Sequence, residues 1–425
     1  MATISEQAAN LRQRWATDPR WAGIERMYSA EDVIRLRGSV MQECTPARLG
    51  ATRLWDLLNS QDAIRALGAA SGSQAVRMVS AGLQAIYLSG RHASANPAPT
   101  TVRRVNRALL REGRAVSPED ASAQKWLAPV VSDAEAGCGE VLNAFELMTD
   151  MIEAGAAGVH FDDQLSGDKE GGQLGGKVLI PTGQHIKALN AARLAADVLD
   201  VPALVIARTA AIEATLLTSD ADERDHEFLT GEQTAEGLHQ VRPGLYACVT
   251  RGLAFAPYAD LLWLETGTPD LAEARAFAQI IHSQYPDKML AYSCSPSCDW
   301  SEHLDDVDIE KFQKELAVLG YRFQFITPAG FDTLDQSVSG PASGDVRRDV
   351  SSFIPRQEAE CSGGALGYSA TAGRHESEAG TGYHDLVTRA LAPETLIAAP
   401  AVPVETAYFV GHDQLDHHGR LVPAD

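Results

Sequence analysis

The chain has 425 residues, 45% of them hydrophobic and 22% charged, which is the balance of a soluble globular protein with one large domain or two to three smaller ones. Its 57 acidic residues exceed its 36 basic ones, giving a formal net charge of −21, and this argues against nucleic acid or an anionic membrane as a partner. A small anionic substrate is not excluded, because one arginine or a metal ion can reverse the field inside a cleft.

The cysteines and the N-terminus indicate the cellular compartment of the protein. The six cysteines form no CxxC pair, so we expect reduced thiols rather than a zinc site. The polar N-terminus, MATISEQAANLRQRW, lacks the apolar core of a signal peptide. No apolar run is long enough to cross a bilayer. We therefore expect a cytoplasmic protein.

Residues 1–60 are predicted to form a helical, amphipathic N-terminal segment. Within it, Ser29 directly precedes AEDVIRLRG, and Asp32 follows three residues later. This spacing is typical of a reciprocal cap at the start of a helix.

From residue 61 onward, short apolar runs that end in small or polar residues alternate with segments of helical character. Because these runs are apolar without alternation, we expect strands that are buried on both faces, as parallel strands are. Eight such units predict a TIM-like (β/α)8 barrel over residues 61–335. A doubly wound open sheet is the alternative, although no GxGxxG follows an early strand. The eight runs lie at 65–72, 85–90, 127–137, 158–164, 204–211, 261–267, 289–297 and 323–330.

Two ranges of residues do not follow this alternation of apolar runs and helical segments. The acidic segment 212–250 is predicted to be an insertion at the rim of the barrel where the strands end. Residues 336–425 are predicted to form a C-terminal helical region and a tail. In the tail, His417 and His418 could bind a metal, but we favour a solvated tail.

The stretch from residue 157 to 182 joins a buried strand to a glycine-rich, charged loop. Asp162 and Asp163 end the strand, and Gly171 and Gly172 lie in the loop that follows. Such a loop after a strand that ends in acids is a common active-site arrangement in α/β proteins. A solvated surface loop after an ordinary strand is the other interpretation.

The remaining strand ends carry more polar residues, which a closed barrel would gather at one rim. Several carboxylates there would repel one another without a divalent cation, and oxygen ligands suit Mg²⁺ or Mn²⁺. An arginine at the same rim is suited to a substrate carboxylate. Such a pocket would take a small di- or tricarboxylate, and a metal that chelates a 2-oxo acid also stabilises an enolate. The residues are the acids Asp133, Glu135, Asp162, Asp163 and Glu265, the arginine Arg208, and Tyr87, Ser89, Gly90, Ser295, Ser297 and Thr327.

Several long strings resemble isocitrate lyase, and the resemblance spans roughly residues 10 to 385. They include SDAEAGCG, NAFELMTDMIEAGAAGVHFDDQL, LGGKVLIPT, RGLAFAPYADLLWLETGTPDL and LAYSCSPSCDW. The resemblance implies a TIM-like barrel with a terminal helix exchanged between subunits, a homotetramer, Mg²⁺ and a place in the glyoxylate cycle.

The same resemblance implies roles for individual residues. Asp133 would hold the metal, with Glu135 and Asp162 as outer partners, and Arg208 would bind substrate. Tyr87 would move the proton of the substrate hydroxyl. The other implied substrate contacts are Ser89 and Gly90 at the glyoxylate end, Gly172 in the loop, and Ser295, Ser297 and Thr327 at the succinate end.

The sequence departs from the family at positions that carry chemistry. Isocitrate lyase has Lys-Lys-Cys-Gly-His in its moving loop, and here Gly171 and Gln173 stand in place of the cysteine and the histidine. Neither residue can exchange a proton as those side chains do. Arg91 replaces a tryptophan and could contact another anionic group, and some fifteen residues after it are missing. Cys298 could replace the lost thiol or could be a buried structural cysteine.

Three interpretations remain open from the sequence. The first is a carbon–carbon lyase or hydrolase acting on an altered 2-hydroxy or 2-oxo carboxylate. The second is an isocitrate lyase with weak activity and a relocated acid. The third is a non-catalytic homologue with a binding or regulatory role. We favour the first, because the metal and arginine positions are retained.

Overall fold

A closed barrel of eight parallel strands forms the centre of the molecule, as the sequence predicts. The computed structural model describes residues 3–89, 98–116, 119, 121–134, 141–165, 177–294, 300–327, 387 and 390. Around the barrel the strands follow the order β1-β12-β11-β10-β6-β4-β3-β2, and every pairing is parallel. The open-sheet alternative is therefore wrong. The strands are β1 (Ile64–Gly68), β2 (Ala85–Leu88), β3 (Val130–Asp133), β4 (Gly158–Asp162), β6 (Leu204–Thr209), β10 (Leu261–Leu264), β11 (Met289–Ser293) and β12 (Tyr321–Ile326).

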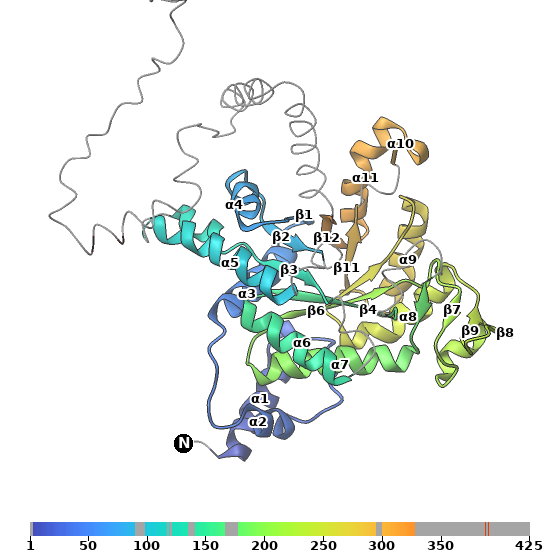
Figure 1. Ribbon diagram of the computed structural model, residues 1–425, viewed down its shortest axis with the longest axis horizontal. Helices are drawn as coiled ribbons and strands as arrows, with labels where there is room; N and C mark the ends of the chain where they lie inside the picture. The colour runs from blue at the N-terminus through green and yellow to red at the C-terminus, as the bar shows by residue number, and fades with distance from the viewer. Residues whose placement is uncertain are drawn as a thin grey trace, which may run out of the picture.

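Helices surround the barrel and cover the outward faces of its strands (Figure 1). They pack mainly against their neighbours in sequence, as βα repeats require. The helices of this layer are α4 (Gly72–Ser80), α5 (Ala98–Ala115), α6 (Val141–Ala154), α7 (Thr182–Val198), α8 (Leu245–Phe255), α9 (Leu271–Gln284), α10 (Trp300–His303) and α11 (Asp306–Val318). Short 3-10 turns connect some of them, at η3 (Ala121–Trp126), η5 (Glu223–Phe228) and η6 (Ala256–Tyr258).

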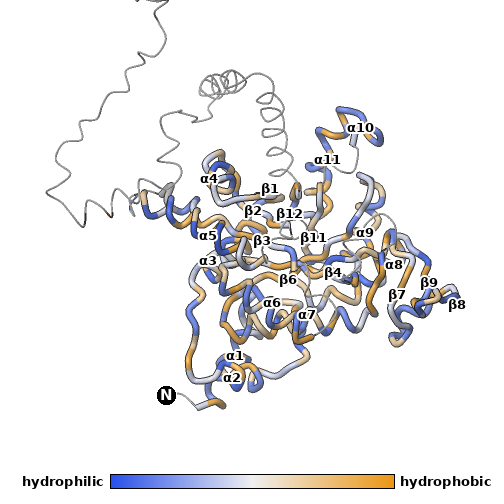
Figure 2. Tube along the Cα trace, viewed as in Figure 1, coloured by the Kyte–Doolittle hydropathy of each residue, from blue (hydrophilic) through white to orange (hydrophobic). Residues whose placement is uncertain are grey.

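The barrel interior is filled by side chains in layers, as alternation along each strand requires. One layer consists of large, mostly apolar side chains, which include Tyr87, Trp263 and Phe325. The next layer toward the strand ends is polar, because the inward-facing residue there is Asp133 on β3, Asp162 on β4 or Arg208 on β6. Figure 2 shows hydrophobic residues along the strands of the barrel. The apolar filling closes the barrel beneath a polar rim.

A second, four-stranded sheet lies beside the barrel, to the right in Figure 1. Its strands are β5 (Val178–Leu179), β7 (Leu216–Leu217), β8 (Leu229–Gln233) and β9 (His239–Val241). β7, β8 and β9 lie in the segment 212–250, which joins the end of β6 to α8. β5 follows the stretch after β4, and it pairs with β7, which follows β6. The small sheet therefore connects the segments that follow two neighbouring barrel strands, β4 and β6.

The N-terminal segment contains α1 (Ile4–Thr17), the 3-10 turn η1 (Pro19–Trp21), α2 (Ala30–Arg37) and α3 (Thr45–Ser60). The predicted cap is confirmed, since the Ser29 hydroxyl and the Asp32 carboxylate each accept a hydrogen bond from the other's backbone N–H. Buried ion pairs fasten this segment to the barrel. Arg20 donates to Asp260 at 2.6 Å, and Arg26 donates to Asp197 at 2.7 Å.

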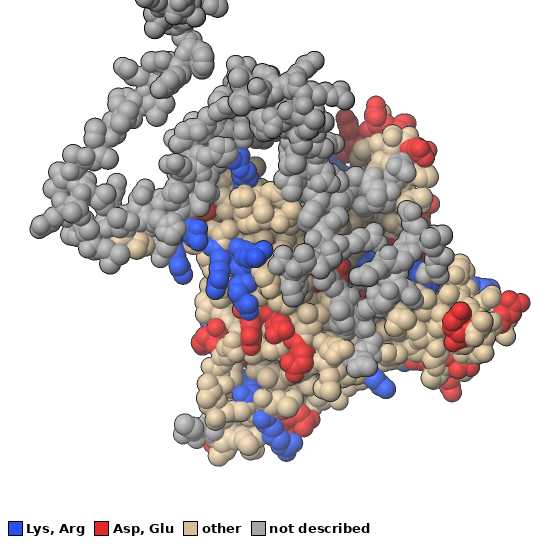
Figure 3. Space-filling model, viewed as in Figure 1, with Lys and Arg blue, Asp and Glu red and all other residues tan. Residues whose placement is uncertain are grey.

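Charge is unevenly distributed over the surface. Basic side chains gather over α5, and acidic ones lie beside them on the face in Figure 3. Within the described residues, no helix is both long enough and apolar enough to span a membrane. The predicted domain boundaries at residues 60 and 335 remain predictions. Apart from residues 387 and 390, the C-terminal region, which includes His417 and His418, lies outside the described residues.

Candidate active site

The candidate site lies where the barrel strands end, and strand register brings its residues together. Asp133 on β3 pairs with His160 on β4, and Asp162 on β4 pairs with Arg208 on β6. Residues two apart on a strand point the same way, so His160 and Asp162 both face inward. Parallel strands therefore bring two carboxylates, an imidazole and a guanidinium into adjacent positions.

Tyr87 lies one layer below the rim, on β2, and contacts His160. Its phenol oxygen is 2.7 Å from Nε2 of His160, and the opposite ring nitrogen, Nδ1, is 3.2 Å from Oδ1 of Asp162. Because a carboxylate only accepts, Nδ1 donates to Asp162, and in the neutral imidazole Nε2 then accepts from the phenol. Burial, followed by the charge of Asp133, raises the pKa of Tyr87 well above its ordinary value. The resting form of Tyr87 is thus the neutral phenol.

Arg208 occupies the centre of the rim. Its Nη1 donates to Oδ2 of Asp162 at 2.5 Å, its Nη2 contacts Glu265, and its guanidinium lies 4.5 Å from the centroid of the Trp263 ring. Burial alone would lower the pKa of Arg208, but Asp162 and Glu265 outweigh it and raise that pKa. The guanidinium therefore stays charged.

Lys177 reaches the same rim from the start of the small sheet. Its ammonium lies 2.9 Å from Glu213 and 3.3 Å from Glu265. Burial tends to raise the pKa of Glu265, yet Arg208 and then Lys177 hold it below its ordinary value. Glu265 is thus an ionised link between two cations.

Three side chains of this site form a cluster that could hold a metal ion. One ligand atom from each of Asp133, His160 and Asp162 lies within 4.8 Å of the others. Both nitrogens of His160 already have partners, so the carboxylate oxygens are the donors that the cluster offers. Oxygen donors fit a hard divalent cation.

Asp163 is the residue that the sequence groups wrongly with the rim carboxylates. It follows Asp162 directly and therefore points to the opposite face of the strand. There it accepts from the Thr209 hydroxyl at 2.7 Å, from the backbone N–H of Ala210 at 2.9 Å and from Arg251 at 3.1 Å. All of these contacts are buried.

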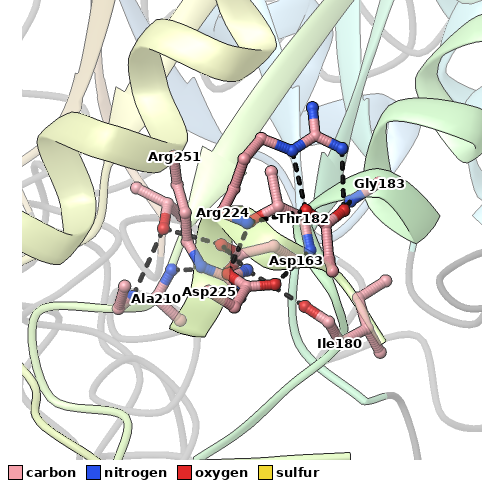
Figure 4. Close-up of polar contacts among 11 residues, drawn as sticks. Asp163, Ile180, Thr182, Gly183, Ala210, Arg224, Asp225 and Arg251 are labelled. Carbon is pink, nitrogen blue, oxygen red and sulfur yellow. Dashed lines mark hydrogen bonds and ion pairs between the residues drawn. The ribbon is translucent and has the colours of Figure 1, made fainter. Parts of the chain in front are cut away.

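Figure 4 shows how this network continues into the small sheet. Arg251 on α8 lies between Asp163 and Asp225 and donates to both. Asp225 in turn accepts from the backbone N–H and the hydroxyl of Thr182 at the start of α7. Asp163 thus ties β4, α7, α8 and the segment 212–250 together, which is a structural role.

The other predicted site residues are divided between the described and undescribed parts of the chain. Ser89 follows β2 and is half-buried. The hydroxyl of Thr327 lies 3.3 Å from that of Ser293, at the ends of β12 and β11. Outside the described residues lie Gly90, Arg91, Glu135, Gly172, Ser295 and Ser297, together with Gly171, Gln173 and Cys298.

The sequence interpretation overlooked His160 as a site residue. It lies within an apolar strand, and its side chain is buried. Its position two residues before Asp162 was the available signal, because that spacing directs both side chains to the same face. Lys177 is a further residue of this rim, and its two carboxylate partners come from distant parts of the chain.

The fold and the site together define a (β/α)8-barrel protein with a carboxylate–arginine cluster at the carboxyl ends of its strands. Residues 7–104, 104–235 and 231–343 match the isocitrate lyase family. The chain is 48% identical over 422 residues to isocitrate lyase 1 of Mycobacterium tuberculosis (strain ATCC 35801 / TMC 107 / Erdman), which covers 95% of this chain and 98% of that protein. It is 46% identical over 415 residues to isocitrate lyase of Escherichia coli (strain K12), covering 91% and 95%. The chain belongs to the isocitrate lyase family.

A solved structure supports the same fold at much lower identity. Oxaloacetate acetylhydrolase in complex with the inhibitor 3,3-difluorooxalacetate aligns with a TM-score of 0.54 over 82% of this chain and 97% of that chain. The two sequences are 16% identical, so this likeness concerns the barrel and not the reaction.

Proposed function

We propose that this chain is a Mg²⁺-dependent carbon–carbon lyase acting on a small 2-hydroxy or 2-oxo di- or tricarboxylate. Its activity on isocitrate itself would be weak or altered. The observation that carries the proposal is the arrangement of Asp133, Asp162 and Arg208 at one rim, with Tyr87 directly beneath. The near-half identity to isocitrate lyases supports the reaction class.

Asp133 and Asp162 would hold the cation, with Glu135 as a further ligand or outer partner. A bound divalent cation supplies Lewis-acid stabilisation of the negative charge that develops beside a carbonyl when a carbon–carbon bond breaks. Mn²⁺ could serve in place of Mg²⁺, since both take oxygen ligands. Asp162 also accepts from His160 and Arg208, so its orientation is fixed from two sides.

Arg208 would bind a carboxylate of the substrate. Its guanidinium is charged, and it is already oriented by Asp162 and by the ring of Trp263, while 12% of the side chain is exposed. A substrate carboxylate would replace Glu265 as the second anionic partner. Lys177 could then keep Glu265 paired, because the lysine contacts it already at 3.3 Å.

Tyr87 would take part in moving the substrate hydroxyl proton. Because its phenol is neutral at rest, it accepts that proton only as it passes its own to Nε2 of His160. The Asp162 carboxylate at Nδ1 stabilises the resulting imidazolium. Ser89, Gly90, Ser295, Ser297 and Thr327 would bind the substrate ends.

The loop sequence supports an altered reaction. Loss of one general acid typically lowers a rate by about 10²–10⁴-fold, and both Gly171 and Gln173 lack a proton to exchange. Gly172 would still approach the substrate with its backbone, and Arg91 would add a cation near the glyoxylate end. We propose a cytoplasmic homotetramer, by analogy with the family.

The second candidate function is that of a non-catalytic homologue that binds a carboxylate for regulation. The observation that favours it is the same pair of loop residues, Gly171 and Gln173. The two functions share the binding site, so a binding measurement cannot distinguish them. A measurement of turnover is needed.

Calorimetric titration with oxalate, in the presence and absence of Mg²⁺, tests the shared site. We expect binding that requires Mg²⁺ and that Asp133→Asn and Arg208→Met each abolish. Arg224→Met is the matched control, because the ion-pair partner of Arg224 is Asp222 and not a residue of the cluster. No binding of oxalate by a folded sample would overturn the proposed site.

A further inference from the structure

A cavity of about 670 Å³ opens at the opposite end of the barrel, where the strands begin. It lies between the end of α3, the ends of α9 and α11, and the first residues of β11 and β12. Its volume falls within the roughly 300–1,000 Å³ of small-molecule sites. Its polar lining residues include Asn59, His282, Ser283, Lys288 and Arg322.

Lys288 is the most informative of these residues. Its ammonium donates one hydrogen bond, to the carbonyl oxygen of Ala259 at 2.7 Å, and among the described residues it pairs with no carboxylate. An ammonium has three N–H donors, so two remain available toward other acceptors. Burial lowers the pKa of Lys288 to about 8. Lys288 is half-buried, and removing a cation from water without an anionic partner is costly.

Arg322 adds a second cation to the same cavity. Its Nη1 donates to the carbonyl oxygens of Gln61 and Asp62, at 2.8 and 3.1 Å. Neither acceptor is charged, and no described carboxylate forms an ion pair with Arg322. Its other guanidinium nitrogens form no hydrogen bond to a described residue.

The charge behind Lys288 is also positive. Arg20 and Arg193 both contact Asp260, so two buried guanidinium groups share one carboxylate. These three groups interact electrostatically with Lys288. On the negative side, Asp287 lines the cavity, and the carbonyl ends of α9 and α11 carry partial negative charge. The side-chain cations exceed the side-chain anions.

We propose that this cavity binds a small oxyanion, a phosphate or a carboxylate, between Lys288 and Arg322. Charge-assisted hydrogen bonds from an ammonium and a guanidinium are the usual means of holding such groups. Because α3 belongs to the N-terminal segment and β11 and β12 to the barrel, the bound anion would link the two and stabilise the folded state.

Titration with inorganic phosphate, pyrophosphate and succinate, without added Mg²⁺, tests this proposal by calorimetry and by the shift in the thermal midpoint. We expect saturable binding, weakened roughly tenfold or more in Lys288→Met and in Arg322→Gln, as loss of a charge-assisted hydrogen bond predicts. Lys187→Met, on the exposed face of α7, is the charge-matched control and should bind as the parent does. A preference for pyrophosphate or for succinate identifies the source of the oxyanion.

A third variant distinguishes binding in this cavity from binding in the active site. Arg208→Met should retain the binding, because Arg208 lies at the other end of the barrel. Three outcomes would overturn the proposal: no saturable binding of any probe, binding unchanged in both cavity variants, or binding lost in Arg208→Met. Unchanged binding in the cavity variants would mean that Lys288 and Arg322 serve only to cap backbone carbonyls.

Discussion

The phenol of Tyr87 and the imidazole of His160 lie stacked inside the barrel, with the phenol oxygen 2.7 Å from Nε2. Their ring planes differ by 7°, and Phe325 stacks on the other side of Tyr87 with 4.3 Å between ring centroids. Since Asp162 fixes the opposite nitrogen of His160, the pair is oriented from both ends. This contact links the apolar interior to the polar rim.

Replacement of Tyr87 by phenylalanine removes the hydroxyl and leaves the ring stack. If Tyr87 moves the substrate proton, kcat should fall by about 10²–10⁴-fold, while the Mg²⁺ affinity stays within a few-fold of the parent. Steady-state kinetics on the best substrate would measure this. Tyr321→Phe is the control, since Tyr321 donates to the carbonyl of Ala274 outside the barrel. An equal loss of activity in both variants would contradict a specific role for Tyr87.

Folding stability should depend on pH through His185. This residue is fully buried on α7, and neither ring nitrogen has a hydrogen-bond partner within the described structure. Burial lowers its pKa from 6.5 to about 4, with Asp163 acting in the opposite direction. Between pH 6.5 and 4 the unfolded chain therefore binds a proton that the folded chain excludes.

Stability from His185 is thus present above pH 6.5 and is lost as the pH falls toward 4. The loss should be on the order of 3 kcal/mol. Urea unfolding at several pH values would measure it, and His185→Leu should flatten this part of the profile. The same slope in both proteins would mean that His185 is not responsible.

The ion network beneath the barrel should be a large contributor to stability. Arg20, Arg193 and the backbone N–H of Val205 all donate to Asp260. Burial alone would raise the pKa of Asp260, but the two arginines hold it far below its ordinary value. Asp260→Asn leaves two buried cations without their carboxylate, at a cost of roughly 3–5 kcal/mol.

Urea unfolding would measure that cost beside an exposed ion pair. Arg12 and Glu31 form such a pair, and Glu31→Gln should change stability little, because exposed pairs are screened by water. Comparable effects of the two substitutions would contradict the proposed anchoring of the N-terminal segment.

Gly68 permits close contact between the first and last barrel strands. A Cβ atom at this position would lie 1.8 Å from the carbonyl oxygen of Thr327. Gly68→Ala must therefore separate β1 from β12 near the rim and should destabilise the fold by roughly 1–3 kcal/mol. Gly50→Ala, where the nearest atom is 3.4 Å away in the middle of α3, should be neutral or stabilising by up to about 1 kcal/mol. Thermal unfolding of both variants would distinguish the two sites.

The barrel could be predicted from sequence because its signal is local. Parallel strands buried on both faces produce continuous apolar runs, and strand ends produce the polar residues that follow them. All eight runs overlap a strand of the barrel, although the last strand, Tyr321–Ile326, begins two residues before the predicted run.

The different roles of neighbouring residues could not be predicted in the same way. Asp162 and Asp163 look equivalent in sequence, but one faces the cluster with His160 and the other faces Arg251 and Thr209. The partners that distinguish them come from β6 and α8, which are 46 and 88 residues away in the sequence. Likewise, Arg208 was expected to face substrate, and its contacts with Asp162 and Glu265 depend on the closure of the barrel.

The most direct test is glyoxylate release from isocitrate with Mg²⁺, assayed beside the Escherichia coli enzyme and beside a panel of 2-hydroxy and 2-oxo di- and tricarboxylates. Our account predicts slow or absent glyoxylate release by the parent chain, an increase in Gly171→Cys with Gln173→His, and Mg²⁺-dependent cleavage of another acid in the panel. Turnover of isocitrate at the rate of the Escherichia coli enzyme would contradict the altered reaction, and failure to cleave any acid in the panel would contradict a lyase.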